Sequence, residues 1–83
     1  MTANKFRAAL DRRFQSASSQ GEDRLILESR ELHRKTGGYP GPNHRMPVCC
    51  EVMRSAMKSG DWIVQAPPKG DGATLKISYA LPR

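Results

Sequence analysis

Long apolar runs are absent from this sequence of 83 residues. A helix that spans a membrane needs about 20 consecutive apolar residues, and no segment approaches that length. The first residues, MTANKFRAALDRRF, are interrupted by charges and lack the apolar core of a secretory signal. We therefore expect a cytoplasmic protein that does not bind a membrane.

Cysteine is scarce, and the two that occur are neighbours, Cys49 and Cys50. A disulfide between adjacent residues strains the intervening peptide, so both are expected to be reduced thiols, as is usual in the cytosol. Zinc sites commonly contain two cysteines about two to four residues apart, and this pattern is missing. His33 and His44 do not complete a zinc motif with the adjacent cysteines. The sequence therefore predicts no metal site and no cofactor.

The reactive side chains do not indicate an enzyme. A Cys–His nucleophile needs a third group that orients the histidine, and none is evident near His33 or His44. A chain of this length forms one small domain, residues 1–83, with a modest core. We therefore expect a binding protein that has no catalytic residues and no deep catalytic cleft.

Acidic residues are outnumbered by basic ones, 8 against 14, which gives a formal net charge of +6. The excess is concentrated in the middle of the chain. Residues 30–58 hold six basic and two acidic side chains, a net +4, whereas residues 1–29 and 59–83 each carry a net +1. A positive field of this kind attracts polyanions, and nucleic acid is the first candidate.

Two helices and a short strand are predicted in the first half of the chain. Phe6, Leu10 and Phe14 recur every four residues, which places them on one face of a helix over residues 3–18. Residues 24–28, RLILE, are typical of a short strand. A second helix is expected over residues 30–36, with Ser29 as its N-cap.

A rigid loop is predicted over residues 37–46, GGYPGPNHRM. Its glycines permit unusual dihedral angles, whereas Pro40 and Pro42 each fix φ and prevent a helix. Tyr39, in the middle of the loop, has two interpretations. Either its ring attaches the loop to the core, or its ring and hydroxyl contact a ligand.

The segment from Pro47 to Lys58 is predicted to be the third helix. Proline suits the first turn of a helix, where the N–H it lacks would have no partner. Apolar and sulfur-containing side chains recur at helical spacing and are expected to pack in the core: Cys49, Val52, Met53, Ala56 and Met57. The opposite side carries Glu51, Arg54, Ser55 and Lys58.

Two strands joined by a tight turn are predicted for the last part of the chain. Residues 61–66, DWIVQA, have the composition of a strand, and residues 73–81 alternate between apolar and polar side chains. The intervening PPKGDG is typical of a turn, so an antiparallel hairpin is expected. The predicted core draws on every element: Phe6, Leu10, Phe14, Leu25, Leu27, Leu32, Val48, Val52, Met53, Met57, Trp62, Val64, Leu75, Ile77, Tyr79 and Leu81.

The expected fold is α+β, in the order helix, strand, helix, helix, strand, strand, with a three-helix core and a C-terminal antiparallel hairpin. This order, over about residues 4–81, resembles the winged helix-turn-helix fold of small bacterial or phage DNA-binding domains. The resemblance implies that the third helix enters the major groove of double-stranded DNA, while the hairpin turn, or wing, contacts the backbone. An α-helix fits that groove, where arginine and asparagine bond to base edges. The implied DNA-binding residues are Tyr39, Asn43, His44, Arg45, Glu51, Arg54, Ser55, Lys58, Arg34, Lys35, Lys69 and Lys76.

One feature departs from the family pattern. The link between the second and third helices, residues 37–46, is longer than the usual short turn. Taken together, the pattern predicts a nucleoid-associated regulator or target-recognition module, alone, as a homodimer or with a larger protein partner. A protein-interaction adaptor is the alternative, because fold does not fix function. RNA binding is a second alternative, although readers of RNA usually offer stacking aromatic rings and this chain has few.

Overall fold

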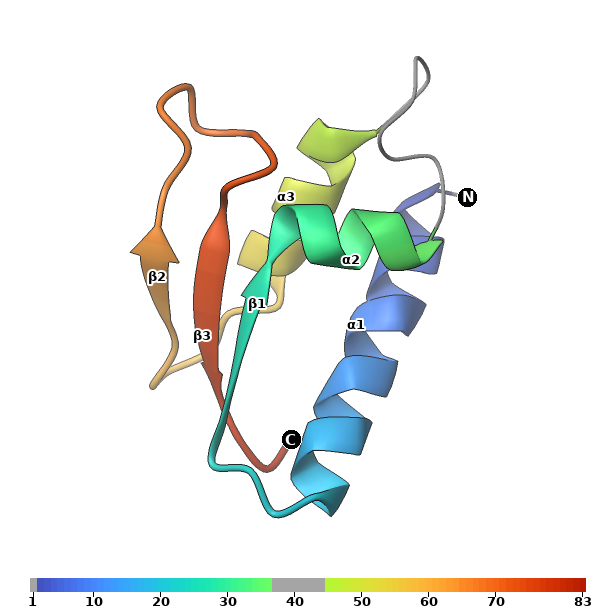
Figure 1. Ribbon diagram of the computed structural model, residues 1–83, viewed down its shortest axis with the longest axis vertical. Helices are drawn as coiled ribbons and strands as arrows, with labels where there is room; N and C mark the ends of the chain where they lie inside the picture. The colour runs from blue at the N-terminus through green and yellow to red at the C-terminus, as the bar shows by residue number, and fades with distance from the viewer. Residues whose placement is uncertain (1, 37–44) are drawn as a thin grey trace.

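The computed structural model of the chain describes residues 2–36 and 45–83. Three of the predicted DNA-binding residues, Tyr39, Asn43 and His44, lie outside this part. Helices and strands follow one another in the predicted order (Figure 1). Their bounds are α1 Thr2–Ser19, β1 Arg24–Glu28, α2 Ser29–Thr36, α3 Met46–Ser55, β2 Trp62–Gln65 and β3 Lys76–Ala80.

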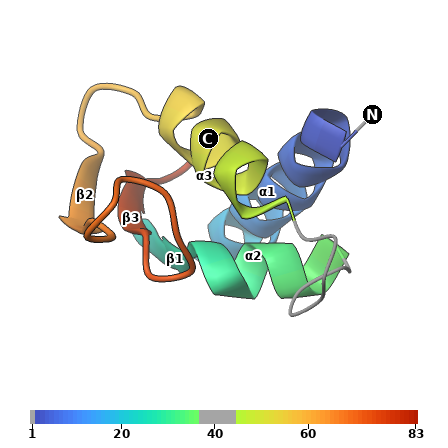
Figure 2. The ribbon, with the colours of Figure 1, turned by 90° about the horizontal axis from the view of Figure 1, so that it is seen from above.

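The α+β class is confirmed: the described residues form three helices and a three-stranded antiparallel sheet with the strand order β1-β3-β2. β3 is central and pairs with both neighbours, so the expected antiparallel pairing of the last two strands is also confirmed. Ser78 of β3 is opposite Ile26 on one side and Trp62 on the other. The helices lie together beside the sheet, with β2 as its outermost strand (Figure 2).

The core forms where the three helices meet the inner face of the sheet. The predicted stripe of α1 is buried, with Phe6, Leu10 and Phe14 each at most 6% exposed. The Phe14 ring lies edge-on to Tyr79, with ring centres 4.9 Å apart, and the Tyr79 hydroxyl donates a hydrogen bond of 2.8 Å to the Met53 carbonyl. Each buried side chain of this size contributes about 1.5–3 kcal/mol. These contacts join α1, α3 and β3 into one core.

The third helix ends at Ser55, earlier than the predicted Lys58. The residues that follow are bound by other groups. The Lys58 amide donates to the Asp61 carboxylate at 2.8 Å, and the Arg83 guanidinium donates to the Ala56 carbonyl. Because these contacts hold the backbone just beyond Ser55, the chain turns toward β2 instead of adding another helical turn.

The burial predicted for Trp62 and Val64 is wrong, since they are 52% and 47% exposed. Both belong to β2, which lies at the edge of the sheet. An edge strand has a neighbour on one side only, so an apolar sequence does not guarantee burial there. The expected strand is also shorter, four residues instead of six.

Asp61 and Arg83 form a buried ion pair near the end of β3. The Asp61 side chain is fully buried and accepts hydrogen bonds from the Lys58 amide, the Ala80 amide and the Arg83 guanidinium at 2.7–3.1 Å. Burial by itself would raise the pKa of this carboxyl, but the hydrogen bonds from Arg83, Ala80 and Lys58 lower it to about 2. The Arg83 guanidinium also lies against the Phe14 ring, 4.7 Å from its centre.

Among residues 2–36 and 45–83, no helix combines the length and the apolarity that crossing a bilayer requires.

Candidate nucleic-acid interface

α3 has one buried and one exposed side, as its sequence predicts. Cys49, Val52 and Met53 are buried in the core. Glu51 and Ser55 are exposed on the other side. This surface is less basic than expected, because Lys58 lies beyond the last helical residue.

Arg54 ties α3 to the β2–β3 loop, residues 66–75. Its guanidinium donates one hydrogen bond of 2.9 Å to the Gly70 carbonyl and another to the Asp71 carboxylate. The hydrogen bond to Asp71 raises the pKa of Arg54. Gly70 has a φ of +86°, a conformation that glycine adopts without strain. Arg54 therefore lies on the predicted side of the helix, but two of its N–H groups are bonded to the loop that was predicted to act as the wing.

A second anchor holds the same loop at Gly72. Its carbonyl accepts a 2.5 Å hydrogen bond from the Ser29 hydroxyl and a longer one of 3.3 Å from the Cys50 thiol. The Gly72 amide in turn donates to the Cys50 sulfur at 3.4 Å. Ser29, predicted to cap α2, thus binds the loop instead. Sequence patterns gave no sign of this contact, because 43 positions separate Ser29 from Gly72.

Four of the predicted DNA-binding cations lie exposed on the segments next to α3. Arg34 and Lys35 lie exposed in the last turn of α2, Arg45 is exposed just before α3, and Lys69 is exposed in the β2–β3 loop. In the part of the chain that the structure describes, Arg34, Lys35 and Lys69 form no ion pair.

Lys35 lines a hollow with Glu22, Arg24 and Glu31, between α1, β1 and α2, to which no residue of α3 contributes. Lys76, the remaining predicted contact, is half-buried at the start of β3.

Charge is distributed unevenly along the long axis of the molecule. Figure 1 shows the end of α2, the beginning of α3 and the β2–β3 loop in its upper half. The turn between α1 and β1, which carries the exposed Glu22 and Asp23, lies at the bottom. The upper end of the molecule is therefore the one that favours an anion.

His33 fixes the beginning of α3 through one of its two ring nitrogens. It is 2% exposed, its Nε2 accepts a 2.8 Å hydrogen bond from the Arg45 amide, and its ring lies edge-on to Phe6. A nitrogen that accepts from an amide is not available to coordinate zinc. Within the two described segments, no cluster of three or more His, Cys, Asp or Glu side chains has a metal-binding arrangement.

The two cysteines are free thiols, as predicted, and both are buried. Burial, followed by the neighbouring Cys50 thiol, raises the pKa of Cys49 to about 12. Because the thiolate is the nucleophile, this environment opposes covalent chemistry at Cys49.

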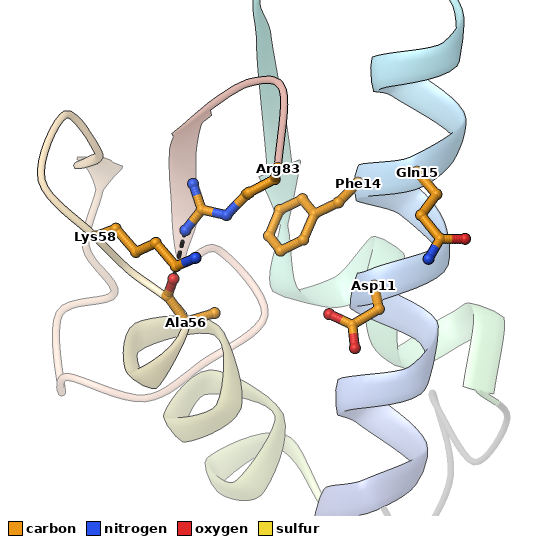
Figure 3. Close-up of a pocket in the computed structure, with 6 residues that line it drawn as sticks. All are labelled: Asp11, Phe14, Gln15, Ala56, Lys58 and Arg83. Atoms are coloured by element: carbon orange, nitrogen blue, oxygen red, sulfur yellow. Dashed lines mark hydrogen bonds between the residues drawn. The ribbon is translucent and has the colours of Figure 1, made fainter.

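A shallow hollow of about 320 Å³ lies between α1 and the end of the chain (Figure 3). Its charged lining consists of Asp11, Lys58 and Arg83. Arg83 is already bound to Asp61 and to the Ala56 carbonyl. The hollow places Lys58, predicted to bind DNA, on the side of the molecule that faces α1.

No protein-family model, no curated protein and no solved structure matches this chain. Its function therefore has to be inferred from its own residues and their geometry.

Proposed function

We propose that the chain binds double-stranded DNA, without catalysing a reaction, through α3 and the β2–β3 loop. The observation that carries this proposal is the set of exposed cations on the segments next to α3. Arg34 on α2 and Lys69 in the loop have no ion-pair partner within the described residues, and Arg45 is exposed just before α3. The element order is the one that a winged-helix interpretation requires.

The proposed contacts divide into two kinds. Arg34, Arg45 and Lys69 would bind phosphates, which fixes the position of the protein on DNA but carries no sequence information. The exposed side of α3 would face the major groove, where the Ser55 hydroxyl can bond to a base and Glu51 can accept from the amino group of cytosine. The predicted contacts Tyr39, Asn43 and His44 lie outside the described residues.

Arg54 takes a different part in this proposal from the one its sequence position predicts. As long as its guanidinium is bonded to Gly70 and Asp71, it holds the loop against α3 and does not reach a base. A loop that is fixed before binding loses less conformational entropy when the complex forms. Arg54 is therefore proposed to position Lys69 for a phosphate.

A salt titration tests the proposal. Three phosphate contacts give a slope of about −3 in a plot of log affinity against log salt, measured by gel shift on a mixed-sequence duplex. Lys69→Ala should reduce the magnitude of the slope by about 1 and weaken binding to all duplexes to the same extent. The matched control is Arg12→Ala, which removes an exposed cation from α1 and should leave the slope unchanged.

Two results would contradict DNA binding: an affinity that does not respond to salt, or no binding to any duplex at low salt. A selection from random duplexes, with methylated and unmethylated pools in parallel, then tests whether the helix reads sequence. Enrichment of a motif supports base reading by α3. A flat selection together with a protein captured by the chain favours the alternative function.

That alternative, an adaptor for another protein, is favoured by the exposed apolar side chains of the sheet. Ile26 and Trp62 are 56% and 52% exposed and flank Ser78 on the same outer face. RNA binding remains the third candidate. Trp62 is the one aromatic side chain of the described residues that is exposed, and the Arg24 guanidinium already lies 3.9 Å from its ring centre.

A further inference from the structure

The outer face of the sheet, opposite the core, is open to solvent. Ser78 of β3 lies between Ile26 of β1 and Trp62 of β2, so these three side chains point to the same face. Leu25 and Tyr79 point to the other face, where they are buried in the core. Ile26 and Trp62 are 56% and 52% exposed. A partner that approaches this face therefore meets an isoleucine and a tryptophan side by side with a buried serine between them.

The Arg24 guanidinium holds the Trp62 ring on the outer face. Its central carbon lies 3.9 Å from the ring centre, which is the geometry of a cation stacked on an aromatic face. Hydrogen bonds of 2.6 Å to the Ser78 hydroxyl and to the Gly60 carbonyl keep the guanidinium in place. Because Arg24 covers one face of the indole, the exposed half of Trp62 consists of the other face and the ring edge.

An indole with one open face can stack against a second flat ring. Proteins that bind single-stranded nucleic acid stack its bases on such side chains, and every base has a flat face that can take part. Trp62 is already held by Arg24 before a partner arrives, so stacking costs little side-chain entropy. The geometry of the ring therefore suits an unpaired base.

Charge at this face favours an anionic partner. Lys76 of β3 is a diagonal neighbour of Trp62, at the roughly 7–8 Å that a long side chain spans. Glu28 lies opposite Lys76 but is bound to Arg30 in an ion pair of 2.9 Å. Within the described residues, Arg24 and Lys76 form no ion pair. The strands thus present two cations here, and their one carboxylate is neutralised.

We propose that the outer face of the sheet binds single-stranded nucleic acid, with an unpaired base stacked on the open face of Trp62 and the adjoining phosphate bound by Lys76. Glu22 lines the hollow next to Ile26, so the strand runs past Trp62 toward Lys76 and away from that hollow. Double-stranded DNA does not make this contact, because its bases are stacked on one another within the duplex. The site is separate from α3 and does not rest on the function proposed above.

A nucleic acid fits this face better than a protein does. A protein that covered Ile26 and Trp62 would also bury Lys76, and a buried cation without a partner is costly. A nucleotide supplies both a phosphate for Lys76 and a flat ring for Trp62. An acidic peptide neutralises Lys76 but has no base to stack on the indole, which makes it the competing ligand to test.

The fluorescence of the chain reports the contact directly, because Trp62 is its single tryptophan. Titration of the full chain at low salt with an oligothymidylate of about eight nucleotides should quench the emission until the site is saturated. A mixed-sequence duplex and a polyglutamate of similar length should leave the emission unchanged. An oligouridylate measured in parallel shows whether RNA or DNA binds more tightly, and saturable quenching by either strand supports the proposal.

Substitutions on β2 test the stacking itself, with a labelled oligothymidylate followed by fluorescence anisotropy. Trp62→Ala should weaken binding about tenfold, because the stacked base loses its partner ring. Trp62→Phe should retain most of the affinity, because an aromatic ring remains. The matched control is Ile63→Ala, which removes an exposed apolar side chain of the same strand that points to the other face and should leave the affinity unchanged. Circular dichroism confirms that each variant is folded.

A salt titration tests the phosphate contact. Lys76→Gln should reduce the magnitude of the log–log salt slope by about 0.7, the value for one phosphate of a single strand. Lys69→Ala, which tests duplex binding, should leave single-strand binding unchanged, so each of the two proposals can fail without the other. Three results overturn the single-strand site: no quenching at about 1 mM oligonucleotide, equal quenching by polyglutamate, or a Trp62→Ala variant that binds as tightly as Trp62→Phe.

Discussion

Arg54 of α3 and Asp71 of the β2–β3 loop form an ion pair, although 17 positions separate them in the chain. The pair joins the helix proposed to enter the major groove to the loop proposed to contact the backbone. Both side chains are partly exposed, at 37% and 41%, and such pairs contribute little to overall stability. Their expected role is to fix the position of the loop.

Arg54 and Asp71 should therefore act as a unit in DNA binding. Arg54→Ala and Asp71→Ala are each expected to weaken binding by about 1 kcal/mol, and the double variant should be no worse than either single one. A double-variant cycle measured by gel shift checks this. If Arg54 instead reads a base, Asp71→Ala would release it, and affinity would stay the same or rise.

The Asp61 carboxyl makes stability depend on pH. Its pKa is about 2 in the folded chain and 3.8 for an ordinary aspartate, so folding favours the ionised form. This stabilisation, about 2 kcal/mol, is fully present above about pH 4 and is lost as pH falls toward about 2. Urea unfolding at several pH values should show the loss.

Asp61→Asn should remove that part of the pH dependence and lower stability near neutral pH, because Arg83 loses its buried partner. The matched control is Asp23→Asn, which changes an exposed carboxylate. Equal acid sensitivity of the original chain and the Asp61 variant would refute this assignment.

Tyr79→Phe should lower the free energy of unfolding by about 1–2 kcal/mol. The change keeps the ring packed on Phe14 but leaves the Met53 carbonyl without the 2.8 Å hydrogen bond that it accepts from the hydroxyl. In a domain of this size the loss lowers the melting temperature by several degrees. A variant as stable as the original chain would mean that the hydroxyl makes no net contribution to the free energy of unfolding.

The Cys49 thiol should be unreactive in the folded protein. With a pKa of about 12 and no exposed surface, it is almost entirely protonated at pH 8, where about a quarter of unfolded cysteines are thiolates. In a Cys50→Ala variant, a thiol reagent should react with Cys49 at least about a hundredfold more slowly in buffer than in denaturant. Similar rates in the two conditions would show that Cys49 is accessible.

Periodicity in the sequence determined the elements whose side chains meet the core. Phe6, Leu10 and Phe14 at helical spacing predicted α1, and alternation around Ile77 and Tyr79 predicted β3. The short apolar segment RLILE predicted β1 with the bounds that the structure has, Arg24–Glu28. These predictions were correct because an amphipathic pattern is a local property, and burial of its apolar side is the main contribution to folding.

The candidate site was only partly predictable. The sequence placed Glu51 and Ser55 on the exposed side of α3 and located the cations of α2 and the loop. It did not reveal that the Arg54 guanidinium is bonded to Asp71, or that Ser29 binds Gly72 and does not serve as a helix cap. Contacts of this kind join residues far apart in the chain, and no local pattern encodes them.

The sequence by itself therefore determined the order of the elements, the apolar side of each helix and the basic middle of the chain. The tertiary structure decided where each element came to lie. Trp62 and Val64 have the composition of a buried strand, yet they are exposed because β3, and not β2, occupies the centre of the sheet. The position of a strand within a sheet depends on all its neighbours, and so it cannot be obtained from the residues of that strand alone.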